Sequence, residues 1–398
     1  AEIMFWKQSN QLVQAEPVWD AARGHDAAFR CAQMFWWYNM YASADFTVTP
    51  RPMYPADGRK LPDVYTQPPS LRGALQDALG TFPLFHFWGP AADLRSSVWI
   101  TRATLRVMRE QRPTMVLAYL PHLDYALQKY GPDDARIPAE VAAVDALCGE
   151  LISAARMQHR HITVVSEYGI TAVSRPVHIN RALRGAGLLR VRDELGREQL
   201  DAGASQAFAV ADHQLAHVYV RERGRLDEVA ALLEALPGVE RVLDDAGKRE
   251  LGLDHARAGE LVAIAAADSW FTYYHFFDDA RAPDYARTVD IHRKPGYDPC
   301  ELFLDPALRL PKLRIGMKLA QKQLGMRTLM DVIPLDATLV RGSHGRPTDD
   351  PELGPILITS TPELLRSNES SVLDIKQLLL DQTFRAGRTW SLSAEVHA

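Results

Sequence analysis

Two continuous apolar runs, each preceded by an amphipathic helical pattern, constrain the fold of this chain more than any other feature. The runs cover residues 114–120 and 161–166, and the helical patterns before them cover residues 96–111 and 138–157. An uninterrupted apolar run is typical of a parallel strand that helices cover on both faces. The alternation of helix and buried strand therefore predicts a doubly wound α/β sheet.

Polar motifs stand directly after both apolar runs, and a third motif lies much later in the chain. The first spans residues 119–124, the second spans residues 166–169, and the third spans residues 341–345. Strand ends that are far apart in sequence meet at one edge of an α/β sheet, where oxygen and imidazole ligands can gather. Together the three motifs predict one metal site at that edge.

Each motif taken alone also has a structural explanation. Asp124 can cap the turn that follows its strand, and His344, between two glycines, can be an exposed turn residue. Glu167 emerges from an apolar strand, where an unpaired buried carboxylate is costly. We therefore expect Glu167 to have an arginine, a lysine or a metal ion as its partner.

Two further groups of polar residues are candidates for binding. His213 and His217 have the spacing of two metal ligands on a helix, but His217 leads into a strand-like segment, so we expect the two rings not to share a face. His292 and Lys294 lie in a loop rich in charge. That loop either holds an anionic substrate or is a solvated turn with local ion pairs.

Composition and charge exclude several classes of protein. The 398 residues carry a net charge of −5, whereas binding to a nucleic-acid backbone needs clustered Lys and Arg. No apolar run approaches the ~20 residues of a membrane span, so we expect no membrane partner. The 3 cysteines are far apart in the sequence, which argues against a disulfide framework and predicts a cytoplasmic protein.

The predicted pattern of secondary structure changes near residue 205. A strand, helix, strand pattern there predicts a small α+β insertion or cap over residues 205–260, between core parts at residues 1–204 and 261–398. The chain also starts abruptly on the apolar residues 1–6, without a signal-peptide pattern. We therefore expect it to begin inside a domain and to lack an N-terminal piece.

The ordered motifs resemble the alkaline phosphatase superfamily and, within it, the nucleotide pyrophosphatase/phosphodiesterase branch, which is type I phosphodiesterase-like. Residues 16–19, Trp36-Trp37, Tyr130-Gly131-Pro132 and residues 180–189 also carry the resemblance. It implies an α/β/α sandwich with a mostly parallel central sheet and a small α+β insertion. It further implies a metal-dependent hydrolase of phosphate esters, acting on phosphodiester or pyrophosphate bonds of small, nucleotide-like substrates.

The resemblance also implies a site. In that family two divalent ions, usually zinc, flank a Thr or Ser nucleophile. Carried over by position, Asp124 and His344 would share one metal and Glu167 would bind the other, with Tyr168 beside it. The family's nucleophile precedes the segment that residues 16–19 resemble, so we expect it upstream of Ala1 and leave it unassigned.

The sequence departs from the family's ligand pattern. Gln128 and Tyr168 stand where the family has histidines, and Glu167 stands where it has an aspartate. The remaining hard oxygen donors shift the expected metal from zinc toward Mn, Mg or Fe. These departures leave two alternatives open beside a phosphate-ester hydrolase. One is a catalytically degenerate binding protein on the same fold, and the other is a hydrolase of phosphonate or sulfate esters.

Overall fold

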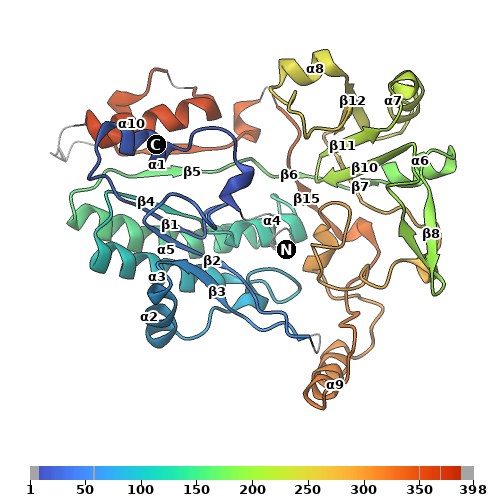
Figure 1. Ribbon diagram of the computed structural model, residues 1–398, viewed down its shortest axis with the longest axis horizontal. Helices are drawn as coiled ribbons and strands as arrows, with labels where there is room; N and C mark the ends of the chain where they lie inside the picture. The colour runs from blue at the N-terminus through green and yellow to red at the C-terminus, as the bar shows by residue number, and fades with distance from the viewer. Residues whose placement is uncertain (1–8, 57–58, 349, 368, 387–398) are drawn as a thin grey trace.

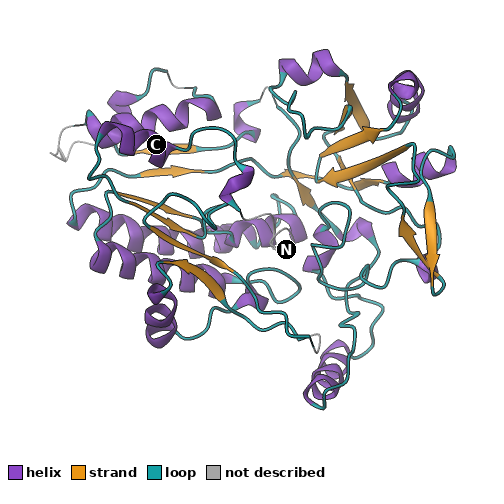
Figure 2. Cartoon of the chain, viewed as in Figure 1, coloured by secondary structure: helices purple, strands orange, loops and turns teal. Residues whose placement is uncertain are grey.

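The chain folds around two sheets that lie side by side, with helices packed against both (Figure 1; Figure 2). A computed structural model describes residues 9–56, 59–348, 350–367 and 369–386. The apolar start of the chain, on which the expectation of a missing N-terminal piece rests, lies outside these ranges. Within them, every helix is too short or too polar to span a lipid bilayer.

The first sheet has the strand order β3-β2-β1-β4. β1 lies parallel to both β2 and β4, and β3 pairs antiparallel with β2 at the edge. Every residue of β1 and β2 is buried, as in strands covered on both faces. The predicted strand at residues 114–120 is confirmed as β4. The strands are β1 (Cys31–Met34), β2 (Phe46–Pro50), β3 (Val64–Gln67) and β4 (Met115–Ala118).

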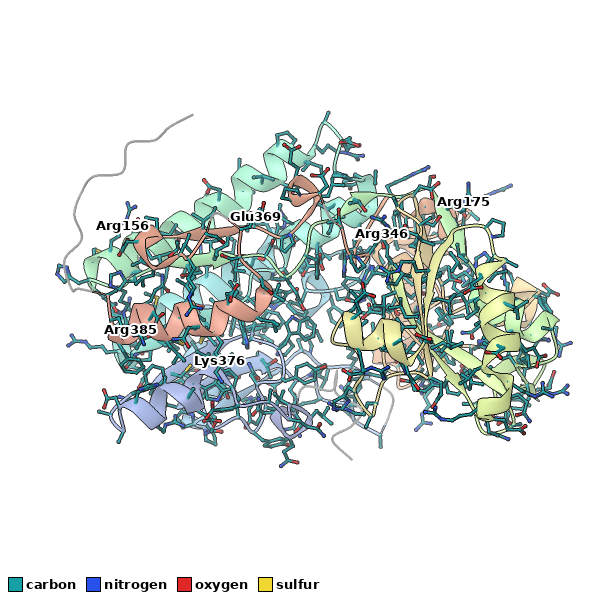
Figure 3. The ribbon with its side chains drawn as sticks, turned by 90° about the horizontal axis from the view of Figure 1, so that it is seen from above. Arg156, Arg175, Arg346, Glu369, Lys376 and Arg385 are labelled. Carbon is teal, nitrogen blue, oxygen red and sulfur yellow. The ribbon has the colours of Figure 1, made fainter. Side chains whose placement is uncertain are left out.

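Helices cover both faces of this sheet, which gives the predicted α/β layering. Helices α2 and α3 pack on one face, where Trp99 lies in the core. Helices α1 and α10 pack on the other face through Trp19 and Leu380. Lys376 of α10, which is labelled in Figure 3, also pairs with Glu16, just before α1, at 3.0 Å. The bounds are α1 (Val18–His25), α2 (Ser70–Leu79), α3 (Leu94–Gln111) and α10 (Ile375–Phe384).

The ends of α3 follow from its sequence. The Asp93 side chain accepts a hydrogen bond from a backbone N–H of the first turn, as an N-cap residue does. At the other end Arg112 adopts a φ of 47°, and the next residue is Pro113, which cannot continue the helix. The helices predicted at residues 96–111 and 138–157 are confirmed as α3 and α5 (Ile137–Met157).

The second sheet is antiparallel and has the order β10-β11-β13-β12. It contains the strands predicted for residues 205–260 and also β13, which follows them. The predicted boundary at residue 260 therefore falls between two hydrogen-bonded strands, and the division into three segments stays a prediction. The elements are β10 (Ala207–Asp212), β11 (Leu215–Val220), β12 (Val239–Leu243), β13 (Leu261–Ala265), α6 (Ile179–Gly185), α7 (Leu226–Glu234) and α8 (Asp245–Glu250).

One predicted strand is less buried than its sequence suggests. The apolar run at residues 161–166 forms β5 (Thr163–Val165), which pairs antiparallel with β16 (Leu357–Thr359). Val165 is 41% exposed. The expectation of a buried strand is wrong because, among the described residues, β5 pairs with β16 alone in a two-stranded ladder near the surface.

Short strands connect the two sheets. β15 (Gly342–Ser343) pairs with β6 (Thr171–Ala172), and β14 (Ser269–Phe271) pairs with β7 (Arg175–Val177). β15 lies directly against α4 (His122–Tyr130), and a Cβ atom on Gly342 would overlap the carbonyl oxygen of Leu127. The backbone N–H of Arg341 donates to the carbonyl of Gln128 at 2.9 Å. The third sequence motif is therefore anchored on the helix that contains the first.

An ion pair ties the hairpin of β8 (Val191–Glu194) and β9 (Arg197–Leu200) to α6. Arg184 donates to both carboxylate oxygens of Glu198, at 2.5 and 3.0 Å. The Glu198 side chain is almost fully buried. Hydrogen bonding to Arg184 lowers the pKa of Glu198.

The contact at Gly342 predicts a large effect of a single methyl group. We expect Gly342→Ala to lower the free energy of unfolding by about 3 kcal/mol, because backbone must shift to relieve the overlap. Gly149→Ala is the matched control, since that glycine lies in α5 with open space around its Cβ position. Chemical denaturation should show the control to be neutral or up to about 1 kcal/mol more stable. Equal effects of the two changes would contradict this packing.

The Arg184–Glu198 pair predicts a pH-dependent contribution to stability. Because the pKa of Glu198 is lowered in the folded state, the pair stabilises the protein above the ordinary glutamate pKa and loses this effect as pH falls. We expect Glu198→Gln to cost about 2 kcal/mol at pH 7 and much less near pH 3.5, measured by urea unfolding. Glu194→Gln, in an exposed pair with Arg192, is the control. A cost that does not change with pH would exclude this origin.

Candidate functional site

Helix α4 presents two of the predicted site residues on one face. Asp124 lies in its first turn, and Gln128 lies one turn later. Gln128 is fully buried. Its amide group faces Asp124 closely enough to lower the pKa of that carboxyl.

Tyr168 connects the three sequence motifs. Its hydroxyl group donates to the Asp124 carboxylate, with distances of 3.1 and 3.2 Å to the two oxygens. Its ring stacks on the His344 imidazole, with centroids 3.5 Å apart and planes 2° apart. The structure thus brings Asp124, Gln128, Tyr168 and His344 together from three remote segments.

His213 extends this cluster from the second sheet. It lies in the turn between β10 and β11 with a φ of 56°, and its ring centroid is 3.9 Å from that of His344. The backbone N–H of Gln214 donates to the His344 carbonyl at 2.8 Å, which fixes the two segments to each other. His217 is elsewhere: it lies within β11, where its Nδ1 accepts a hydrogen bond from the backbone of Gly259.

Glu167 does not have the surroundings that we expected. It is exposed, because the strand before it lies near the surface, so its carboxylate can be solvated without a cation. Partial desolvation raises its pKa, and the charged neighbour that raises it further is another carboxylate, Asp212. The expected Arg, Lys or metal partner is therefore not needed to explain this side chain.

The ionisable groups of the cluster have displaced pKa values. Burial raises the pKa of Asp124 to about 6, and the Tyr168 hydrogen bond and the nearby Gln128 amide oppose this rise. Burial lowers the pKa of His213 to about 3, and burial with the neighbouring His213 lowers that of His344 to about 2. At neutral pH the cluster therefore contains one carboxylate close to its titration range and two neutral imidazoles, a combination common at functional sites.

These residues do not complete the expected two-metal centre. A zinc site needs three or four ligands around one point. In the part of the chain that the structure describes, no three His, Cys, Asp or Glu side chains lie close enough together to hold a metal ion. Tyr168 occupies the space between Asp124 and His344, and Glu167 is exposed. The arrangement therefore does not support the expected pair of ions, whether Zn or Mn, Mg or Fe.

Lys294 lies in a buried network of ion pairs and not at a surface that could contact a substrate. Its ammonium group lies 2.7 Å from both the Asp298 and the Glu301 carboxylates, and all three side chains are fully or almost fully buried. The indole N–H of Trp88 donates to Glu301 at 2.6 Å. This placement argues against the predicted substrate contact. His292 lies partly buried in the same loop, and its role stays a prediction.

The sequence did not single out Tyr297 as a site residue. Its ring centroid is 4.8 Å from that of His213, and its backbone N–H donates to the Ala211 carbonyl at 2.8 Å. Gly296 before it has a φ of 135°, and a Cβ there would collide with the Ala211 backbone. The Pro-Gly dipeptide before this tyrosine was the available signal, since it marks a sharp approach of the loop to another strand.

Replacement of Lys294 tests whether this lysine stabilises the fold or binds substrate. We expect Lys294→Met to lower the free energy of unfolding by about 3–5 kcal/mol, because it leaves two buried carboxylates without a cation. Lys312→Met, at an exposed lysine, should change it by less than about 0.5 kcal/mol. Thermal and urea unfolding measure both. A Lys294→Met protein of normal stability that binds substrate poorly would restore the original prediction.

Comparison with known proteins places the chain in a family. Its sequence matches the type I phosphodiesterase/nucleotide pyrophosphatase model over residues 1–298. Phosphonoacetate hydrolase from Sinorhizobium meliloti 1021, solved with phosphonoformate, has a TM-score of 0.53 and 14% identity over 94% of this chain and 76% of its own. Murine ectonucleotide pyrophosphatase/phosphodiesterase 5 has a TM-score of 0.43 and 13% identity, covering 87% of this chain and 63% of its own. No curated protein sequence gives a significant match.

The family match and the structural likeness support different statements. At 14% identity the phosphonoacetate hydrolase shows a shared fold alone, and it confirms the predicted alkaline-phosphatase type of α/β architecture. The sequence match covers most of the chain and contains the Asp124, Tyr168 and His213 segments. The chain belongs to the type I phosphodiesterase/nucleotide pyrophosphatase family, whose members hydrolyse phosphate esters.

Proposed function

We propose that this protein hydrolyses phosphodiester or pyrophosphate bonds of small, nucleotide-like substrates at the cluster of Asp124, Tyr168 and His344. The observation that carries the proposal is that Asp124, Tyr168 and His344, from three remote segments, lie in direct contact. Family membership supports the class of reaction. The convergence of the three motifs supports its location, because they are the segments through which the chain resembles the family's site.

Asp124 is the residue in this cluster best suited to move a proton. With a pKa of about 6 it is largely ionised at neutral pH and can still exchange a proton, as a general base or acid requires. The Tyr168 hydroxyl group holds the carboxylate in one orientation. We assign no nucleophile. Members of the family typically depend on divalent metals, and metal dependence is therefore a quantity to measure here.

The test uses the full-length protein and a chromogenic diester, bis(p-nitrophenyl) phosphate. We expect Asp124→Asn to lower kcat/KM at least about 100-fold, since it removes a group that transfers protons. Asp227→Asn, at an exposed position in the first turn of α7, is the matched control and should leave the rate unchanged. Elemental mass spectrometry on the same samples measures Zn, Mn, Mg and Fe. Unchanged hydrolysis by Asp124→Asn would place the reaction elsewhere.

A second candidate function is a catalytically degenerate binding protein on the same fold. Tyr168 favours it, because its ring and hydroxyl group cover His344 and Asp124, two of the expected metal ligands. In that case the wild-type protein binds a nucleotide in calorimetry but hydrolyses nothing. The double variant Gln128→His/Tyr168→His, which supplies the family's imidazoles, would then gain metal and activity. Assays with phosphonoacetate and an aryl sulfate beside the diester distinguish hydrolysis of phosphate esters from hydrolysis of phosphonates or sulfate esters, the alternatives that the sequence left open.

A further inference from the structure

Helix α9 (Pro311–Gln323) lies at the edge of the molecule, away from both sheets (Figure 1). Residues 306–330, which contain it, include six Lys or Arg residues and no Asp or Glu. The whole chain, in contrast, carries a net charge of −5. This segment is therefore a local concentration of positive charge on an acidic protein.

The apolar side of α9 faces the solvent. Leu313, Met317, Ala320 and Leu324 follow one another at helical spacing and are all exposed, with Leu313 at 56% and Leu324 at 77%. A helix on the surface of a globular protein normally turns such a stripe toward the core. The exposed apolar surface also continues past the helix at Leu310, Met326 and Leu329.

The inward side of α9 is held by a few contacts. Ile315 packs against a core cluster of the body. Lys318 lies 2.5 Å from Asp331 and donates to the Leu329 carbonyl at 2.6 Å, and Arg314 also pairs with Asp331. A single carboxylate thus serves two cations, so the segment keeps a large excess of positive charge. These contacts fix the orientation that exposes the apolar stripe.

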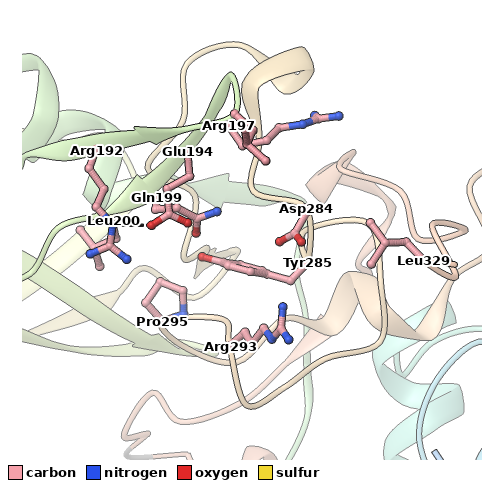
Figure 4. A pocket seen from close by; sticks show the side chains of 11 residues that line it. Arg192, Glu194, Arg197, Gln199, Leu200, Asp284, Tyr285, Arg293, Pro295 and Leu329 are labelled. Carbon is pink, nitrogen blue, oxygen red and sulfur yellow. Dashed lines mark hydrogen bonds and ion pairs between the residues drawn. The ribbon is translucent and has the colours of Figure 1, made fainter. Parts of the chain in front are cut away.

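A cavity of about 710 Å³ continues this surface toward the hairpin of β8 and β9 (Figure 4). Leu329 lines it together with Leu195, which is fully exposed at the tip of the hairpin. Its charged lining consists of three guanidinium groups and two carboxylates, from Arg192, Arg197, Arg293, Glu194 and Asp284. Two exposed apolar projections therefore flank a cavity with an excess of positive charge.

We propose that α9, its flanking residues and the Leu195 hairpin tip form a surface that docks on an anionic lipid bilayer. Aliphatic side chains surrounded by Lys and Arg are typical of helices that lie in the membrane interface, and each basic residue near anionic lipid adds about 1 kcal/mol. The excess of positive charge around these exposed aliphatic side chains complements an anionic lipid surface, which favours a bilayer over a protein partner. The sequence-based expectation of no membrane partner rested on the absence of a spanning segment and does not apply to such a helix.

Vesicle flotation of the full chain tests this surface independently of any enzymatic activity. We expect binding to phosphatidylcholine vesicles that contain phosphatidylglycerol and little binding to phosphatidylcholine alone. Binding should weaken as salt rises from 0.1 to 1 M, where the screening length falls from about 10 to 3 Å. Leu313→Asp/Met317→Asp should reduce the bound fraction at least about 10-fold with an unchanged unfolding temperature.

Two controls make the result decisive. Leu373→Asp removes another highly exposed leucine, far along the chain from α9, and should leave vesicle binding unchanged. Lys312→Glu should weaken binding to anionic vesicles alone. Equal binding to neutral and anionic vesicles, or binding that the double variant does not alter, overturns the proposal. So does a dimer in sedimentation that the double variant abolishes while vesicles bind neither form.

Discussion

The approach of β15 to α4 at Gly342 is the contact on which the site depends. It allows the backbone of the third motif to touch the helix that contains Asp124, and the next residues then reach the β10–β11 turn through the Gln214–His344 hydrogen bond. Arg346, a little farther on and labelled in Figure 3, pairs with Glu240 of β12 at 2.6 and 3.0 Å. One short segment therefore joins the helix beside the first sheet to the second sheet.

Tyr168 gives the cluster a chemical character different from the one that the sequence resemblance predicts. A buried carboxylate needs either a cation or hydrogen-bond donors. At Asp124 a phenol hydroxyl group serves as such a donor, and the same ring covers the neutral His344. Where the resemblance predicts a histidine ligand, this chain therefore has a hydrogen-bond donor that contacts both predicted ligands, Asp124 and His344.

Local sequence patterns predicted the elements well, because helices such as α3 and strands such as β4 are determined by their own periodicity and caps. The burial of residues 161–166 could not be predicted in the same way, since it depends on which strands pair with β5. The gathering of the three motifs was inferred from their order. The approach of His213 and Tyr297 was not, because it arises from the pairing of a separate sheet and loop.

The network around Lys294 also limits how this protein can change over evolutionary time. One ammonium group satisfies two buried carboxylates, and the loop that it holds places Tyr297 beside His213. Replacement of Lys294 leaves two carboxylates without their cation, and replacement of either carboxylate leaves the lysine with one partner instead of two, so the fitness effect of each substitution depends on the residues at the other two positions. Substitutions in this loop are therefore expected mainly at its exposed positions. Replacement of Lys294, Asp298 and Glu301 requires coordinated changes, because the effect of each substitution depends on the others.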